Sequence, residues 1–190
     1  MKVLVACEFS GIVREAFTSA GHYAVSCDLL PTEIEGNHYQ GDVMDIINED
    51  WDLMIAHPPC TYLAVSGARW WAGRQQEQND AIEFVRQLMS APIKRIAIEN
   101  PIGKLSTAIR KPDQIIQPWQ FGEDASKKTC LWLKNLPLLM PTKIIIKKRY
   151  ANQTPSGQNN LAPSLNRAKI RSITYSGIAV AMAEQWGKND

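Results

Sequence analysis

Short apolar runs alternate with amphipathic stretches along the chain, and most of the runs end in a polar or proline-rich turn. Apolar runs bounded by turn residues are typical of buried strands, whereas apolar residues spaced by three and four indicate helices. The pattern predicts strands at residues 2–6, 23–27, 53–56, 94–98, 129–133 and 143–146. It predicts helices at residues 11–20, 77–90 and 173–186. Strands that alternate with helices in this way favour an α/β fold with a mainly parallel sheet and helices on both faces.

Turns and loops are expected between these elements. Residues 31–40 should form a loop with one short strand, and residues 118–122 a turn. Residues 151–166 are rich in Asn, Gln, Ser, Pro and Gly, and a polar segment of this length favours a flexible or binding loop. The strands at 129–133 and 143–146 could pair as an antiparallel hairpin near the C-terminal end. Without repeats or a change in composition, residues 1–190 should form a single domain.

The overall charge is close to neutral but unevenly distributed. The chain has 21 Lys and Arg residues against 19 Asp and Glu residues, and its formal net charge of +2 does not by itself indicate nucleic acid. Three basic clusters nevertheless fall in the last third, at residues 127–128, 147–149 and 167–171. Each cluster alone is typical of a solvated surface, whereas together they fit a side that faces a polyanion.

The four cysteines, Cys7, Cys27, Cys60 and Cys130, stand far apart in the sequence. They form no Cys-x-x-Cys pair and no Cys/His spacing typical of zinc, and scattered thiols are common in a reducing compartment. No apolar run reaches the length of a membrane span. We therefore expect a cytoplasmic protein without a metal site and without a membrane partner.

The first part of the chain combines a strand, a turn, a helix, a second strand and a final acid, Asp28. This is the order of a nucleotide-binding half of a doubly wound fold. Gly11 would let a ligand approach the backbone, the helix start would offer free N–H groups, and Asp28 could accept hydrogen bonds from ribose hydroxyls. Asp42 could bond an adenine amino group or cap a turn. Because Val13 and Arg14 stand where further glycines would fall, an ordinary α/β turn fits equally well.

The segment His57-Pro58-Pro59-Cys60 follows the apolar run at residues 53–56. The two prolines end the strand and stiffen the turn, because neither has an N–H for the sheet. They leave Cys60 at the carboxyl end of a buried strand, where open α/β sheets bind ligands. The next predicted strand ends in Glu99-Asn100-Pro101, so parallel neighbours would bring Cys60 and Glu99 to one rim. A buried structural thiol and a capping carboxylate are the alternatives.

Taken in order, several motifs resemble those of the DNA cytosine carbon-5 methyltransferases. The most specific of them are Pro-Pro-Cys and the later Glu-Asn at a strand end. The matching pieces are Phe9-Ser10-Gly11, Asp28, Gly41-Asp42, Pro58-Pro59-Cys60, Ser66-Gly67, Glu99-Asn100, Phe121-Gly122 with Lys127, and residues 177–180. The resemblance implies a Rossmann-like S-adenosylmethionine-dependent methyltransferase fold, in a small member of the type found in phages and restriction-modification systems.

The resemblance also implies covalent chemistry at Cys60. A thiolate that adds to the sixth ring carbon of cytosine activates the fifth carbon toward a sulfonium methyl group. Glu99 would neutralise the N3 side of the ring, which requires a raised pKa, and Lys127 would hold the exocyclic carbonyl. Further substrate contacts would come from Ser66, Asn100, Arg167 and Arg171. The cofactor S-adenosyl-L-methionine would be bound by Phe9, Ser10, Gly11, Asp28, Asp42, His57 and Pro58.

The chain departs from the family where a separate target-recognition domain would lie. Only residues 133–171 separate the matching segments there, so DNA reading would be rudimentary or supplied by a helper subunit or a second copy of the chain. The expected function is methylation of the fifth ring carbon of cytosine in DNA. The alternatives are the same chemistry on a free pyrimidine nucleotide or single-stranded nucleic acid, and a non-catalytic module that binds nucleic acid or a partner.

Overall fold

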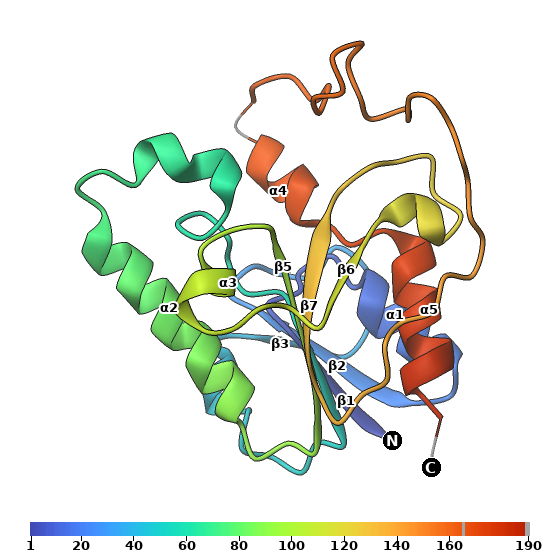
Figure 1. Cartoon of the computed structure of the whole chain (residues 1–190). Helices are drawn as coiled ribbons and strands as arrows, with labels where there is room; N and C mark the ends of the chain where they lie inside the picture. Colours follow the sequence, from blue (N-terminus) through green and yellow to red (C-terminus); the bar gives the residue numbers. More distant parts are fainter. Residues whose placement is uncertain (165, 189–190) are drawn as a thin grey trace.

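The computed structural model describes residues 1–164 and 166–188, and its strands form one seven-stranded sheet of order β3-β2-β1-β4-β5-β7-β6 (Figure 1). The strands are β1 (Lys2–Ala6), β2 (Tyr23–Asp28), β3 (His38–Gln40), β4 (Leu53–Ala56), β5 (Arg95–Pro101), β6 (Gln114–Ile116) and β7 (Thr129–Lys134). From β3 to β5 every pair is parallel, and the order reverses between β1 and β4. Doubly wound sheets bind ligands at such a switch point.

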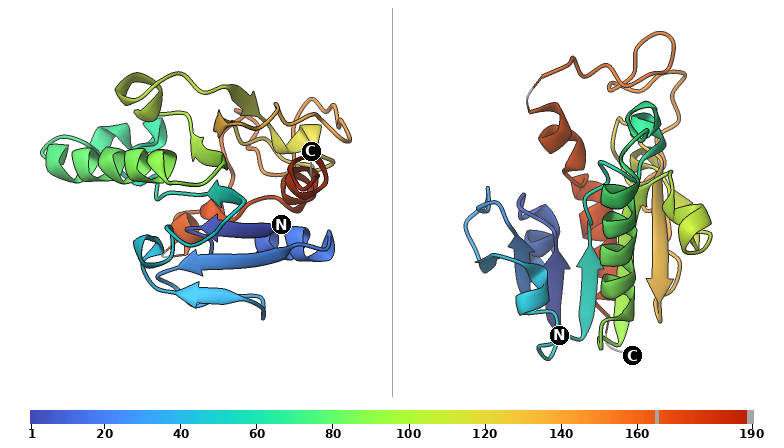
Figure 2. Two further views of the ribbon diagram at one scale, coloured as in Figure 1. Left: turned by 90° about the horizontal axis from the view of Figure 1, so that it is seen from below. Right: turned by 90° about the vertical axis from the view of Figure 1, so that its left-hand side faces the viewer.

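Helices cover both faces of the sheet (Figures 1 and 2). On one face α1 (Ile12–Ser19) packs against α5 (Ser176–Trp186), and on the other lies α2 (Gln75–Ser90). The short elements are α3 (Leu105–Ala108), α4 (Arg167–Ser172) and the 3-10 helices η1 (Val43–Asp45), η2 (Val65–Trp70) and η3 (Pro118–Gln120). None of the helices in the described ranges is long and apolar enough to cross a membrane.

The sheet has an apolar core on each of its two faces, because helices cover both. Along β1, Val3 and Val5 join the cluster beneath α1 and α5, whereas Leu4 and Ala6 join the cluster beneath α2. Successive side chains of a strand point to opposite faces, so a strand covered on both sides must be apolar throughout. All residues of β4 are buried for the same reason. The continuous apolar runs in the sequence therefore mark the centre of this sheet.

The antiparallel pair near the C-terminal side is present, but residues 143–146, the predicted hairpin partner, do not form a strand. β7 pairs antiparallel with β5 on one side and with β6 on the other, so both of its edges are occupied. Residues 143–146 instead run beside η3, where Lys143 forms one bridge to Phe121. Ile144 and Ile146 are exposed. The prediction of a strand at residues 143–146, which was based on their apolar side chains, is therefore wrong.

Smaller differences concern the ends of elements. The helix predicted over residues 173–186 begins at Ser176, and α4 lies immediately before it. β6 was not predicted, because three residues are too few for a periodic pattern. The polar loop predicted over residues 151–166 includes residue 165, which lies outside the described residues. Near the start of this loop Ser126 N donates to Asn152 Oδ1 at 2.9 Å, and Asn152 Nδ2 donates to Ser126 O at 3.0 Å.

Candidate active site

Neighbouring parallel strands bring the Cys60 segment and the Glu99 segment together. β4 and β5 pair in parallel, with Ala56 opposite Ile98. Beyond this pair β4 leads into residues 57–60, whereas β5 continues through residues 99–101, which lie beyond the predicted end of the strand at residue 98 and pair with β7. This is the arrangement expected from two apolar strands that each end in a polar group and proline.

Direct bonds fasten these two segments to each other. Asn100 Nδ2 donates to the carbonyl of Pro58 at 2.9 Å, and Lys104 N donates to the carbonyl of Leu63 at 2.8 Å. Gly103 packs so closely on the Leu63 carbonyl that no Cβ would fit there. The chain that follows Cys60 is thus held against the chain that follows β5.

Glu99 lies almost completely buried, with 8 % of its surface exposed. Its Oε2 accepts a hydrogen bond from His57 Nδ1 at 2.7 Å. Burial alone would raise the pKa of Glu99, but the charge of Lys127 and the bond and charge of His57 hold that pKa below its ordinary value. The raised pKa of Glu99 expected from the family chemistry is therefore wrong, because the carboxyl group has cationic neighbours.

Cys60 is partly buried at the same rim. Burial raises the pKa of its thiol, Lys127 and Arg171 lower that pKa, and Glu99 raises it, with burial the largest effect. These groups therefore lie within electrostatic reach of one another. The net increase means that the resting thiol is protonated at neutral pH, so a reaction at Cys60 needs a further change that favours the thiolate.

Lys127 and Arg171 reach this rim from two distant parts of the sequence. β7 runs antiparallel to β5 with Thr129 opposite Pro101, which places Lys127 beyond the carboxyl end of β5. Arg171 lies on α4, which sits above the strand ends in Figure 1. Ser66 is exposed on η2 and Arg167 begins α4, and within the described residues neither side chain bonds to residues 57–60.

The motif Phe9-Ser10-Gly11 forms a buried turn between β1 and α1. Gly11 has a φ of 75°, in the left-handed region that favours glycine, and a Cβ there would lie 2.8 Å from the guanidinium of Arg14. This position therefore requires glycine for two independent reasons.

Two acids lie beside this turn, at the ends of β2 and β3. Asp28 Oδ1 accepts from Leu30 N at 2.9 Å, and Asp42 Oδ1 accepts from Met44 N at 3.0 Å as the cap of η1. The Oδ2 atoms of both acids have no hydrogen bond within the described residues. Burial, Asp28 and Asp42 all raise the pKa of the Cys7 thiol, which shows that the two carboxylates converge near β1.

Glu8 is a buried acid that the motif comparison missed. Its Oε1 accepts from Val13 N at 2.6 Å and from Ser10 Oγ at 3.2 Å, and its Oε2 accepts from Arg14 N at 3.1 Å. The expectation of free N–H groups at this helix start is therefore wrong for Val13 and Arg14. Glu8 lies three residues before the N-cap Gly11, outside the position where a capping residue is normally sought.

Arg14 is fully buried although it occupies a position expected to be glycine. Its guanidinium donates to Ser26 Oγ at 3.1 Å and to the carbonyl of Ile34 at 2.7 Å. It lies between Gly11 and Gly36, where a Cβ on either glycine would meet it. Arg14 thus fills the space of a glycine-rich turn and fixes the loop between β2 and β3.

Phe9 is covered by α4. The Lys169 Nζ lies 5.0 Å from the centre of the Phe9 ring and 2.7 Å from Glu33 Oε1. Only 8 % of Phe9 is exposed. Through Lys169 and Arg171, one short helix contacts the Phe9 side of the rim and acts on the thiol of Cys60.

His57 and Pro58 were predicted to bind the cofactor, and in the structure both contact residues of β5. The side chain of His57 bonds to Glu99, and the carbonyl of Pro58 accepts from Asn100. Both residues therefore contact the end of β5, and their assignment to the cofactor stays a prediction, as it does for Phe9, Ser10, Gly11, Asp28 and Asp42.

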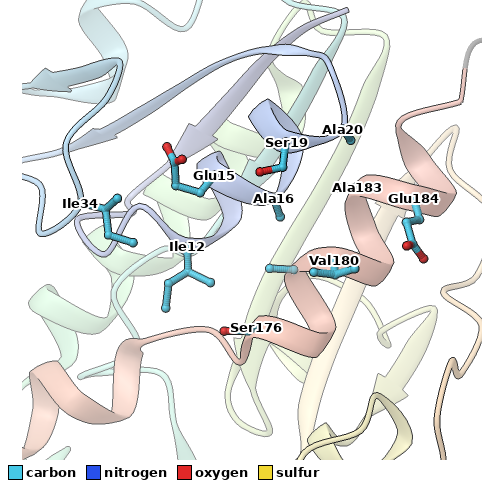
Figure 3. A pocket seen from close by; sticks show the side chains of 11 residues that line it. Ile12, Glu15, Ala16, Ser19, Ala20, Ile34, Ser176, Val180, Ala183 and Glu184 are labelled. Atoms are coloured by element: carbon cyan, nitrogen blue, oxygen red, sulfur yellow. The ribbon is translucent and has the colours of Figure 1, made fainter.

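A hollow of about 490 Å³ lies on the flank of the sheet between α1 and α5, and its lining residue Ile12 directly follows the Gly11 turn (Figure 3). It is lined mainly by small and apolar side chains, among them Ile12, Ala16, Val180 and Ala183. None of the predicted site residues lines it. The candidate active site therefore lies at the rim beneath α4 and not in this hollow.

Comparison with protein-family models gives no match, and no curated protein matches the chain. Two solved structures are similar. One is described as a DNA modification methyltransferase encoded within an E. coli prophage, with a TM-score of 0.52 and 15 % identity over 76 % of this chain and 52 % of that one. The other is the S. pombe Dnmt2 methyltransferase, with a TM-score of 0.47 and 18 % identity over 73 % and 50 %.

The chain thus spans about half the length of each of these two structures. At such identities the likeness concerns the fold. It confirms the expected Rossmann-like α/β fold.

Proposed function

We propose that this protein transfers a methyl group from S-adenosyl-L-methionine to the fifth ring carbon of cytosine in DNA, through a covalent bond to Cys60. The most direct support is that four reactive or charged side chains lie within electrostatic reach at the ends of β4 and β5, namely Cys60, Glu99, Lys127 and Arg171. A nucleophile, a carboxyl group and two cations are the groups that addition to an electron-poor ring requires.

In the proposed reaction the Cys60 sulfur forms a bond to the sixth ring carbon. Lys127 and Arg171 stabilise the thiolate, and Lys127 holds the exocyclic carbonyl oxygen as negative charge develops on the ring. Glu99 faces N3 and the neighbouring amino group. After the fifth carbon has taken the methyl group it loses its hydrogen as a proton, and the bond between Cys60 and the ring then breaks.

The cofactor would supply the methyl group and would lie across the first two strand ends. Phe9 offers an aromatic face, and Asp28 and Asp42 each have an oxygen that could accept from a ribose hydroxyl or an adenine amino group. These residues fit an adenosine-bearing molecule. Lys169 lies over the Phe9 ring, so binding by stacking on that face requires the Lys169 side chain to move.

We place the DNA above α4, whose basic residues Arg167, Lys169 and Arg171 lie near the rim. Cations at such a surface bind phosphates and position the strand, whereas the target base must leave the stack to reach a buried thiol. Asn100 and Ser66 would contact the flipped nucleotide. We further propose that a helper subunit or a second copy of the chain contributes to sequence recognition, and that the described chain acts as one domain.

The test is transfer of a labelled methyl group to three substrates: duplex DNA, single-stranded DNA and free deoxycytidine monophosphate. We expect incorporation into DNA by the wild type and none by Cys60→Ser. Cys130→Ala, a control at a buried thiol, should retain activity. If only the free nucleotide is methylated, the proposed chemistry is correct but its substrate is the nucleotide and not DNA. If no substrate is labelled in a Cys60-dependent manner, the proposal is wrong, and cofactor binding without transfer would then favour a non-catalytic binding module.

A further inference from the structure

Residues 138–149, the outer strip, run over the surface beside α5 and η3. Four large apolar side chains of this segment are 52–87 % exposed: Leu138, Met140, Ile144 and Ile146. Between them Leu139 is fully buried and Ile145 is half-buried. Alternate side chains of an extended segment point to opposite sides, and the side that faces water is normally polar. The outer strip is apolar on both sides, which is typical of a segment that is covered on both.

The backbone of the outer strip is bonded along one edge. Glutamine side chains of β6 and α5 bond to the N–H and C=O groups of residues 139–140 at 2.8–2.9 Å. Ile145 N donates to the carbonyl of Trp119 at 2.8 Å. The backbone groups of Ile144 and Ile146 have no hydrogen-bond partner within the described residues. The strip is therefore held in place on its inner edge, while its outer edge can pair with a further extended segment.

The charge of this part of the chain is entirely positive. Residues 125–183 contain ten Lys and Arg residues and no Asp or Glu. Four of the ten lie in the outer strip, and within the described structure only Lys147 of these four forms an ion pair, with Asp124. Such a surface attracts an acidic partner, and it repels an identical strip on a second copy of the chain.

Resting on the proposed function, in which a helper subunit contributes to sequence recognition, we propose that this subunit docks on the outer strip. The docking segment of the subunit alternates apolar and acidic side chains. Its apolar side chains cover Ile144 and Ile146, its carboxylates pair with Lys148 and Arg149, and its backbone bonds to the open edge. DNA fits this surface less well, because phosphates gain nothing from isoleucine side chains, whose burial is the main source of affinity here.

The first test selects peptides on the wild-type protein from a displayed library of random short peptides. We expect the enriched peptides to alternate apolar residues with Asp or Glu. Their affinity should fall about tenfold or more when Ile144→Ser and Ile146→Ser are combined, since two apolar contacts are lost. Tyr23→Ser, at an exposed aromatic residue of β2, is the control and should leave the affinity unchanged. Enriched peptides that lack acids, or that bind the double variant as well as the wild type, would overturn the proposal.

Two further measurements on the double variant examine the other occupants. It should bind duplex DNA as tightly as the wild type, and weaker binding would identify the strip as a DNA surface and overturn the proposal. It should also sediment as the wild type does, and loss of a wild-type dimer would show that a second copy covers the strip instead. The thermal unfolding midpoint should stay the same because both side chains are exposed. If the double variant unfolds, Ile146→Ser alone, at the most exposed of the four side chains, replaces it.

Methyl transfer is measured separately and without a partner. A wild type that transfers methyl groups but enriches no strip-dependent peptide would overturn this inference alone. A wild type that binds acidic peptides on the outer strip but transfers no methyl group would overturn the proposed function, and the docking surface would then serve another purpose than methylation.

Discussion

Glu8 and Arg14 are buried charges that determine the geometry of the first turn. The Glu8 carboxylate accepts from two backbone N–H groups of α1, and the Arg14 guanidinium is enclosed between Gly11 and Gly36. A helix start is a ready-made anion site, and here the chain provides the anion itself. The residues proposed to bind the cofactor are therefore held in place by bonds that exist before any ligand arrives.

Replacing Glu8 by Ala should destabilise the protein. Val13 N and Arg14 N would lose their acceptor, so the free energy of unfolding should fall by about 1–3 kcal/mol in urea denaturation. Glu49→Ala, at an exposed acid with no side-chain bond in the described structure, is the matched control and should change it by less than about 0.5 kcal/mol. Equal effects of the two substitutions would argue against the capping role of Glu8.

The reactivity of Cys60 should depend on Lys127. The lysine lowers the thiol pKa, so Lys127→Met should raise that pKa further and leave less thiolate. Alkylation of Cys60 by iodoacetamide at pH 8, followed by mass spectrometry, should slow by about three- to tenfold, because less thiolate is present. Lys128→Met, at the exposed neighbour, should not slow it. A Lys127 variant that reacts at the wild-type rate would contradict the proposed arrangement.

Among the elements, α4 has the most direct influence on the rim. Its Lys169 is paired with Glu33 and lies over Phe9, while its Arg171 acts on Cys60. It is only six residues long and follows a polar loop. Under the proposed function, the part of α4 that the cofactor has to displace is the Lys169 side chain over Phe9.

Removing the contacts of Lys169 with Glu33 and Phe9 should increase the affinity for the cofactor. In Lys169→Met the ion pair to Glu33 and the contact of the ammonium with Phe9 are lost. Since an exposed pair contributes about 0.2–1 kcal/mol, the affinity for S-adenosylhomocysteine measured by calorimetry should increase by about 1.4- to fivefold. Lys148→Met, at an exposed lysine outside α4, serves as the control. A weaker affinity in the Lys169 variant would mean that this lysine binds the cofactor instead of covering its site.

For the whole molecule, the sequence indicated most of the sheet because strands buried on both faces must be apolar throughout. The same reasoning placed Cys60 and Glu99 on adjacent strand ends. It failed for residues 143–146, since an apolar run does not show whether a sheet edge is free to receive it. The bond from His57 to Glu99 was not predicted either, because the direction of a side chain in a proline-rich turn depends on the backbone around it.

The central claim is tested most directly by a covalent complex with DNA that contains 5-fluorocytosine. The fluorine replaces the hydrogen that must leave, so the enzyme stays bonded to the ring after methyl transfer. Intact-mass analysis should show one oligonucleotide and one added methyl group per chain, only with S-adenosyl-L-methionine present, and peptide mapping should locate the bond at Cys60. A chain that binds this DNA and the cofactor but forms no adduct, or forms it at another residue, would contradict the account.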